Sequence, residues 1–457
     1  MRRISGGKQF FCFRCVLAFF FLFSSGLSAE ESPAAGTEEG LVCPITLEEA
    51  IVLALNGNLE LKQQQLELSY REKEALSSWN AFLPDISLSG GLRNSHGFGP
   101  SAASGTDVTL SGGISLTLAA GIAETLQQAK IARSSALVSY AQAELDLICD
   151  VKTRFYALLS DKENLVLLEE SLQLARSQED FVRRNYQNGL ASELEYLRSR
   201  YAAASIEPQL TNARRLYRQA IRDFCLLLGI PEETRLDPAD RLEPVLPEVR
   251  LPADTQALID RRGDVMLAVL AVENAESELS ASRWNRFGPS VSFHENLSVG
   301  DFTAPRDLSG NGSFSVSVSI PLGGYIPGSQ QALASERSRV NLEQAKIALE
   351  NTRTAAGQEV LSLFNTIQDI TETFAINRMN ETFAARAYEL SRAGFDAGLV
   401  SQTDLEIARQ DFLSARYTVI AAVTQYRSSL AELAHALNVS EEALWAENTT
   451  TGRGNAE

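Results

Sequence analysis

Histidine and cysteine, two residue types that often serve in catalysis or metal binding, are few and scattered in this 457-residue chain. The three histidines, His96, His294 and His435, are too widely spaced to indicate a metal site or a catalytic triad. The sequence contains no nucleophile elbow, zinc-binding motif or ATP-binding loop. We therefore expect no catalytic residue, no metal ligand, no cofactor and no enzymatic activity.

Once Cys12 and Cys15 are set aside with the N-terminal segment, the remaining cysteines do not form a metal-binding pattern either. Cys43, Cys149 and Cys225 follow the N-terminal segment in an odd set without metal-like spacing, so we expect isolated thiols. Lipidation of Cys43 as a mature N-terminus is the alternative. The four residues before it, 39–42, lie well beyond the apolar N-terminal segment and lack the small residue expected beside such a cysteine.

Residues 1–29 have the pattern of a secretory signal peptide. Four basic residues precede or interrupt the apolar run 10–23, small residues fill 24–29, and cleavage is expected near Ala29. A retained anchor fits less well, because the uncharged run 16–23 is shorter than the roughly 20 residues of a spanning helix. Removing four basic residues and no acid takes the net charge from −17 to −21, which argues against a nucleic-acid partner.

An internal duplication organises the rest of the chain. Segment 77–88 aligns with 282–293 at a shift of 205, and both carry Trp-Asn-x-Phe-x-Pro. At a shift of 209, further pairs follow: Phe155 with Phe364, Tyr186 with Phe395, Gly189-Leu190 with Gly398-Leu399, Ser192 with Ser401, and Tyr217 with Tyr426. We predict two repeats, 30–229 and 255–439, a proline-rich linker at 230–254 and a polar C-terminal tail at 440–457.

Each repeat is expected to contain a helix, two short strands and two long helices. Thr46 and Glu49 have the spacing of a capping box at the start of the first helix, whose counterpart is expected at 254–285. Apolar residues at coiled-coil spacing over 158–182 indicate a coiled-coil seam. If the segment 122–188 forms one continuous helix, that helix is about 100 Å long. Pro208 should kink or interrupt the returning helix, whereas the second repeat has Tyr417 at that position.

Four segments alternate apolar and small polar residues: 86–92, 108–118, 291–299 and 314–320. Their lengths suit tilted membrane strands of roughly 9–11 residues, and the segments 94–107 and 300–312 have the composition of loops. Four strands are too few to close a membrane barrel, and lipid tolerates no open strand edge. Three copies supply twelve strands, whereas two copies close only a narrow, side-chain-filled barrel. The expected fold is mainly α, a long coiled-coil helical barrel joined to a trimeric twelve-stranded β-barrel.

The duplicated order of elements resembles the TolC-like outer-membrane efflux proteins over nearly the whole mature chain. The resemblance is carried by Pro84 and Pro289 before the strands, and by the turn segments 186–190 and 395–399. It implies a homotrimeric passive exit duct in the outer-membrane lipid, with its helices in the periplasm. It also implies docking to a periplasmic membrane-fusion adaptor and, through that adaptor, to an inner-membrane pump.

The resemblance also implies candidate site residues. The helical tips that contact the adaptor correspond to Asn188, Gly189, Leu190, Ala397, Gly398 and Leu399. Glu195 and Asp404 match positions at the narrow end of the duct, where three-fold rings of acids would favour cations and raise the carboxyl pKa values.

These assignments have structural alternatives. Glycine at a helix end is also simply the residue tolerated in a left-handed cap, and Ser192 with Glu195 also has capping-box spacing. The family's second acid, bridging tyrosine and bridging arginine fall on Ile407, Phe395 and Val400, which puts its salt-bridged lock in doubt. Trp79 and Trp284 are candidates for interface anchoring or for packing where strands meet helices. A secreted or periplasmic coiled-coil scaffold without a pore is the alternative function, and the cargo is not predicted.

Overall fold

The computed structural model describes residues 43–96, 105–300 and 309–445. The predicted signal peptide, the centres of both predicted strand loops and most of the predicted tail lie outside the described residues. One part of that tail, residues 441–445, forms the short helix α9 (Glu441–Trp445), whose Leu444 is buried.

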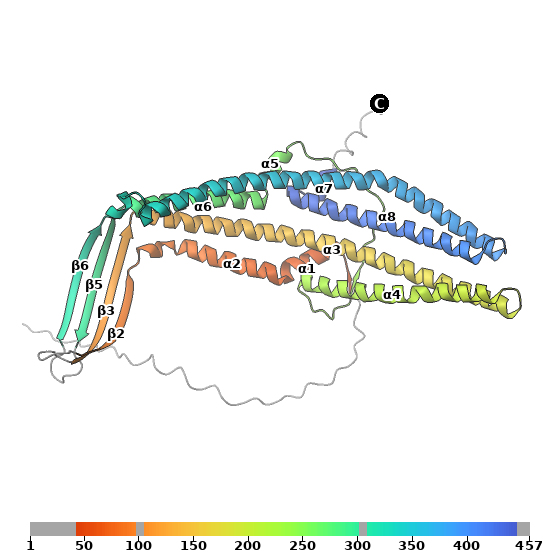
Figure 1. The fold of residues 1–457 in the computed structure, drawn as a ribbon, viewed down its shortest axis with the longest axis horizontal. Helices are drawn as coiled ribbons and strands as arrows, with labels where there is room; N and C mark the ends of the chain where they lie inside the picture. The colour runs from red at the N-terminus through yellow and green to blue at the C-terminus, as the bar shows by residue number, and fades with distance from the viewer. Residues whose placement is uncertain (1–42, 97–104, 301–308, 446–457) are drawn as a thin grey trace, which may run out of the picture. The chain divides into compact units, whose positions relative to one another are not determined.

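The two halves of the chain contain the same series of elements (Figure 1). The first half consists of α1 (Leu47–Gly57), α2 (Leu59–Leu76), the 3-10 helix η1 (Ser78–Phe82), β2 (Asp85–Ser95), β3 (Gly105–Ala119), α3 (Ile122–Gln187) and α4 (Glu193–Leu228). The second half consists of α5 (Thr255–Ile259), α6 (Gly263–Phe287), β5 (Ser290–Gly300), β6 (Ser309–Ser319), η2 (Leu322–Tyr325), α7 (Gln330–Asp396) and α8 (Gln402–Leu437). A short parallel pair, β1 (Cys43–Ile45) and β4 (Leu236–Pro238), joins the start of the first half to the connector.

The opening helix of each half is divided in two. The predicted capping box at Thr46 is confirmed, because its side chain accepts from the Glu49 amide and Glu49 accepts from the Thr46 amide. Asn58 then ends α1 and caps α2, with its side chain accepting from the Leu61 amide at 2.9 Å. The counterpart expected at 254–285 is likewise two helices, α5 and α6, so a single helix there was the wrong prediction.

The long helices form two hairpins, α3 with α4 and α7 with α8. Helix α3 is continuous over 66 residues, and the predicted coiled-coil seam is confirmed, because Leu158, Leu172 and Val182 on its apolar stripe are buried. Of the two effects expected at Pro208, the interruption does not occur, because α4 continues through this residue, and the kink stays a prediction. Because Pro208 has no N–H, the carbonyl oxygen of Ala204 loses its helical partner. Both residues are solvent-exposed, so water can donate a hydrogen bond to that oxygen instead.

Two hydrophobic clusters hold the helices together near the C-terminal ends of α4 and α8, at the open ends of the two hairpins. In the first half, Phe155 and Phe224 are both buried and their ring centroids lie 6.1 Å apart. In the second half, the buried Tyr426 donates its hydroxyl hydrogen to the carbonyl oxygen of Pro247, which ties the connector to α8. Each cluster therefore combines its own hairpin with its own opening helix or connector.

The four main strands form one antiparallel sheet in the order β2-β3-β5-β6. Its register brings apolar side chains together on one face, for example Leu116 beside Phe293 and Phe293 beside Val316. The opposite face carries serine, threonine, asparagine and histidine, as where Ser115 pairs with His294. The strands are longer than predicted, because residues 94–95, 105–107 and 309–312 of the expected loops continue the ladders.

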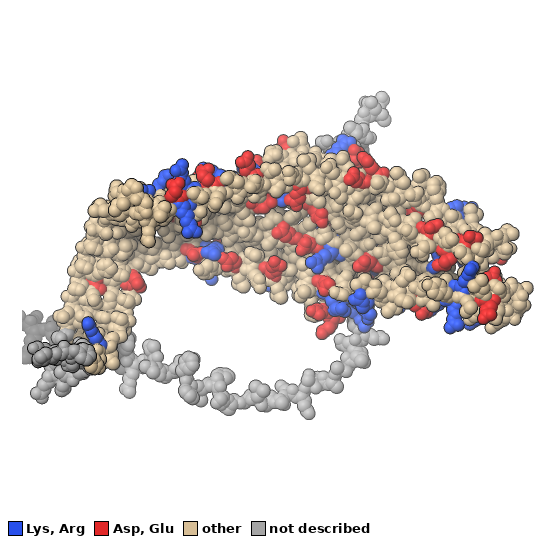
Figure 2. All heavy atoms as spheres, in the orientation of Figure 1, with Lys and Arg blue, Asp and Glu red and all other residues tan. Residues whose placement is uncertain are grey.

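Charge is distributed unevenly between sheet and helices (Figure 2). Among residues of β2, β3, β5 and β6 with described side chains, the charged ones are Asp85, Arg93 and Glu295, whereas charges of both signs are scattered over the helices. Within the described residues, no helix offers the apolar stretch that a bilayer crossing needs.

Candidate functional site

The tip of the first hairpin is a tight turn built by glycine. Gly189 has a φ of 75°, and its amide donates to the carbonyl oxygen of Tyr186 at 3.0 Å. The Leu190 amide donates to the carbonyl oxygen of Asn185 at 2.8 Å. Together these two bonds form a Schellman cap, which satisfies carbonyl groups at the end of α3.

The tip of the second hairpin repeats this geometry. Gly398 has a φ of 76° and donates to the carbonyl oxygen of Phe395 at 2.9 Å, while Leu399 donates to that of Gly394 at 2.8 Å. The structural interpretation of both glycines as left-handed caps is therefore confirmed.

The predicted tip residues lie together at the two turns, at the end of the hairpins remote from the sheet (Figure 1). Leu190 and Leu399 are 79% and 85% exposed, although leucine at this position of a Schellman cap often packs on the helix. A Cβ atom added to Gly189 or Gly398 would have no neighbour within 4 Å. Each turn thus presents an apolar side chain to solvent from a backbone closed by two hydrogen bonds. Contact with an adaptor stays a prediction.

The candidate ring acids lie in the first turns of α4 and α8. The Glu195 carboxylate accepts from the Ser192 amide at 2.7 Å and from its hydroxyl at 3.0 Å, so the predicted capping box is present. These bonds lower the pKa of Glu195, the backbone bond most strongly. Asp404 forms a similar but incomplete arrangement, in which its carboxylate accepts from the Ser401 hydroxyl at 2.7 Å. Both acids are exposed, so the capping role leaves their charges accessible to solvent.

Side chains behind the tips join the two hairpins, and sequence reasoning did not identify them. Arg198 on α4 donates to the Thr403 hydroxyl on α8 at 3.1 Å. Arg409 on α8, only 7% exposed, donates to the Ser171 hydroxyl on α3 and pairs with Glu406. The sequence contains one indication that Arg409 matters, because a shift of 209 aligns it with another arginine, Arg200.

Phe395, Val400 and Ile407 stand where the resemblance places the residues of a salt-bridged lock. They do not form ion pairs because their side chains are apolar. Phe395 packs edge-on against Phe181 of α3 with ring centroids 6.3 Å apart. Ile407 is 55% exposed beside the Arg198–Thr403 contact. The hairpins of this chain are therefore connected by an aromatic pair and arginine hydrogen bonds at these levels.

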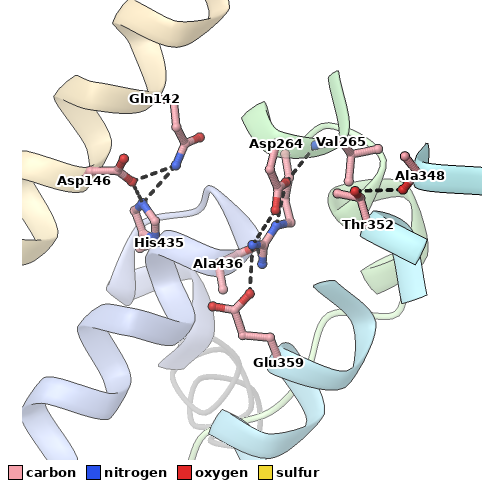
Figure 3. Close-up of polar contacts among 10 residues, drawn as sticks. Gln142, Asp146, Asp264, Val265, Ala348, Thr352, Glu359, His435 and Ala436 are labelled. Carbon is pink, nitrogen blue, oxygen red and sulfur yellow. Dashed lines mark hydrogen bonds and ion pairs between the residues drawn. The ribbon is translucent and has the colours of Figure 1, made fainter. Parts of the chain in front are cut away.

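A second polar cluster lies where α8 ends against the first half (Figure 3). His435 contacts Asp146 of α3 at 2.7 Å, and Arg262 pairs with Asp264 at 2.9 Å and with Glu359 at 2.8 Å. Among the described residues, no group of three or more histidine, cysteine, aspartate or glutamate side chains is placed to hold a metal ion. This cluster joins α3, α6, α7 and α8, and its visible role is structural.

The two remaining predicted features have mixed surroundings. Trp284 donates its indole N–H to Glu124 of α3 at 2.9 Å, so it packs where α6 meets α3 although 47% of it stays exposed. Trp79 is 58% exposed.

Burial raises the pKa of the Cys149 thiol to about 12 and also raises the pKa of the Cys225 thiol, so both thiols stay protonated near neutral pH.

Curated relatives of this chain are efflux proteins. It is 24% identical over 399 residues to the toluene efflux pump outer membrane protein TtgC of Pseudomonas putida, covering 82% of this chain and 81% of the relative. The antibiotic efflux pump outer membrane protein ArpC of Pseudomonas putida matches with the same identity and coverage.

Solved structures share the fold. The CmeC outer membrane channel of Campylobacter jejuni superposes with a TM-score of 0.71 at 19% identity, covering 91% of this chain and 94% of that one. The outer membrane protein VceC of Vibrio cholerae gives a TM-score of 0.68 at 16% identity, covering 87% and 97%. The predicted mainly helical fold with four strands is confirmed.

A sequence profile of the outer membrane efflux protein family matches residues 50–229 and 255–439, which together make up well over half of the chain. The matched segments include both hairpins and all four main strands. The chain is therefore a member of the outer membrane efflux protein family.

Proposed function

We propose that this protein forms a homotrimeric, passive exit channel through the outer membrane. The observation that carries the proposal is the open sheet. Among the described residues, β2 and β6 each pair on one side only, so two ladders of backbone groups lack partners. Such edges are not tolerated in lipid, and joining β6 of one copy to β2 of the next closes a twelve-stranded barrel from three copies.

The two faces of the sheet support the same arrangement. Leu88, Phe314 and Val318 on the apolar face are 77%, 68% and 67% exposed, which is unfavourable in water and suits contact with lipid. The serine-rich face would then line the channel. Glu295 is an exception, because its partners Ile114 and Phe314 place it on the apolar face.

The helices are proposed to continue the duct into the periplasm, with the tips docking to an adaptor that leads to an inner-membrane pump. Relatives named as parts of efflux pumps support this assignment. Leu190 and Leu399, exposed on two similar turns, offer three apolar contacts of each kind in a trimer. Three copies of Glu195 and Asp404 would place acidic side chains around the opening and favour cations.

The assembly is tested by the mass of the detergent-solubilised protein together with its conductance in planar bilayers. We expect a complex of three chains and a steady, passive conductance. A monomer that stays soluble without detergent and keeps its strand content would overturn the channel and favour the scaffold alternative.

The acid ring is tested with Glu195→Gln and Asp404→Asn, which remove charge while keeping a side-chain oxygen able to accept the hydrogen bond from Ser192 or Ser401. We expect the double variant to lose much of its cation selectivity while trimer stability changes little. Unaltered selectivity would exclude the ring.

The tip is tested with Gly398→Asp. Aspartate tolerates the left-handed conformation better than most residues, and open space surrounds this position, so the trimer should persist. We expect export to be lost in cells that contain the matching adaptor and pump, whereas Gly398→Asn, of the same size but uncharged, should retain part of it. Full export by Gly398→Asp would exclude adaptor contact at this turn.

A further inference from the structure

A polar cavity lies between the two hairpins, a short distance behind the tips. Its volume is about 260 Å³, enough for a small ion or molecule rather than a single water. Helices α3, α4, α7 and α8 all contribute to its wall, so an occupant would contact both hairpins at once.

Two amide groups in this wall lack hydrogen-bond partners within the described part of the chain. They are the acceptor Oε1 of Gln402 and the donor Nε2 of Gln178. Gln402 is only 9% exposed, so its carbonyl oxygen is held away from bulk solvent. A buried polar atom without a partner is unfavourable, and these two together would match a ligand that both donates and accepts.

The charges of the wall favour an anion. Arg184, Arg392 and Arg409 outnumber the acids Asp396 and Glu406. Arg409 and Glu406 pair with each other, whereas neither Arg184 nor Arg392 forms an ion pair with any described residue. Gln402 is also the first residue of the 36-residue helix α8, whose N-terminal end adds positive potential.

We propose that this cavity binds an oxyanion that carries a hydroxyl group, of which monohydrogen phosphate is the simplest. The oxygens of the anion accept from the guanidinium groups of Arg184 and Arg392 and from Gln178 Nε2. Its hydroxyl donates to Gln402 Oε1. The bound anion links α3 to α7 and α8, and so adds to the contacts that Arg198 and Arg409 already make between the hairpins.

The proposal is tested on the full-length purified protein by calorimetric titration with inorganic phosphate at constant ionic strength. This readout does not depend on channel activity, so it stands apart from the proposed function. We expect saturable phosphate binding, and binding of sulfate about tenfold weaker because sulfate has no hydroxyl to donate at neutral pH. Absence of saturable heat would mean that the cavity holds only water. Equal affinity for both anions would exclude recognition through Gln402.

Variants separate the parts of the site. Gln402→Leu should weaken phosphate binding about tenfold and leave sulfate binding nearly unchanged, whereas Arg184→Gln with Arg392→Gln should weaken both. Arg200→Gln is the matched control, because Arg200 is exposed and does not line the cavity. Thermal unfolding of each variant confirms that it is folded. If the arginine pair binds phosphate as the wild type does, the anion binds elsewhere and the proposal fails.

Discussion

The two hairpins have the same backbone at their tips and different side chains behind them. Both turns close with a left-handed glycine and a Schellman pair of hydrogen bonds. Within about twenty residues of these turns, aligned side chains of the two repeats already have different surroundings. Arg200 of α4 is exposed, whereas Arg409, its aligned partner on α8, is buried against α3.

This difference shows how a duplicated sequence gives two non-equivalent halves. Turn and cap residues act locally, so both copies need them and both retain the same geometry. Residues further along each helix meet different neighbours, because α8 packs against α3 of the other hairpin. Pro208, exposed on α4, and its aligned partner Tyr417, half-buried on α8, follow the same rule. Matched substitutions at aligned positions therefore separate local from tertiary effects.

The largest contrast is expected at the far ends of α4 and α8. Gly229 and its aligned partner Asn438 both adopt left-handed caps, with φ of 71° and 52°. A Cβ atom on Gly229 would lie 2.2 Å from the carbonyl oxygen of Gly57, so Gly229→Ala must force α1 and α4 apart. We expect a loss of about 4 kcal/mol in unfolding free energy from overpacking and strain. Asn438→Gly should change it by less than about 0.5 kcal/mol.

Denaturant unfolding followed by circular dichroism measures both variants. A small effect of Gly229→Ala would show that α1 can move away from α4 at little cost. The two caps would then be equivalent in context as well as in backbone.

The next contrast concerns the two aligned arginines. Arg409→Ala removes the partner of the partly exposed Glu406 and leaves the buried Ser171 hydroxyl without this contact, and should cost about 2 kcal/mol in unfolding free energy. Arg200→Ala, on the exposed side of α4, should cost less than about 0.5 kcal/mol. Thermal unfolding of the two variants side by side is the measurement. Equal losses would mean that burial of Arg409 does not distinguish the second hairpin.

The strands provide a third matched pair. A shift of 205 aligns Glu295 of β5 with Gly90 of β2, so the second repeat alone carries a carboxyl group on the apolar face. If that face meets lipid, Glu295→Leu should stabilise the assembly by about 1–2 kcal/mol, because a carboxyl group is costly there.

His294→Leu, one residue away on the polar face, is the control and should give no such gain. Unfolding of the protein in lipid vesicles measures both. A loss of stability in Glu295→Leu would show that the apolar face does not contact lipid, and the proposed orientation of the sheet would be wrong.

Local patterns explain what the sequence could predict. Thr46 with Glu49, Ser192 with Glu195, and the two tip glycines act through neighbours a few residues away, so their geometry follows from spacing. Apolar alternation also located the four strands. Their ends were missed because Asn94 and Gly310 have loop-like propensities, which hydrogen bonding to neighbouring strands overrides.

The contacts between hairpins could not be predicted because they join residues far apart in sequence. Ser171 and Arg409 are separated by 238 positions, and neither residue type indicates burial on its own. The cavity between the hairpins depends in the same way on four helices meeting. A shift of 209 aligns Arg409 with Arg200, but that alignment does not show which of the two arginines is buried.

The smallest contrast is between the two acids near the tips. Glu195 accepts two hydrogen bonds from Ser192, and its pKa is lowered from the ordinary value of 4.5. A carboxyl group whose pKa is lower in the folded state stabilises that state above its unfolded pKa, and the gain is lost as pH falls through the folded pKa. Glu195→Ala should therefore cost about 0.5 kcal/mol at pH 7 and progressively less below pH 4.5. Asp404→Ala, which removes a single acceptor of the Ser401 hydroxyl, should cost less at pH 7. Hydrogen exchange in the first turns of α4 and α8 across this pH range measures both, and a pH-independent effect of Glu195→Ala would show that the carboxylate charge does not support the cap.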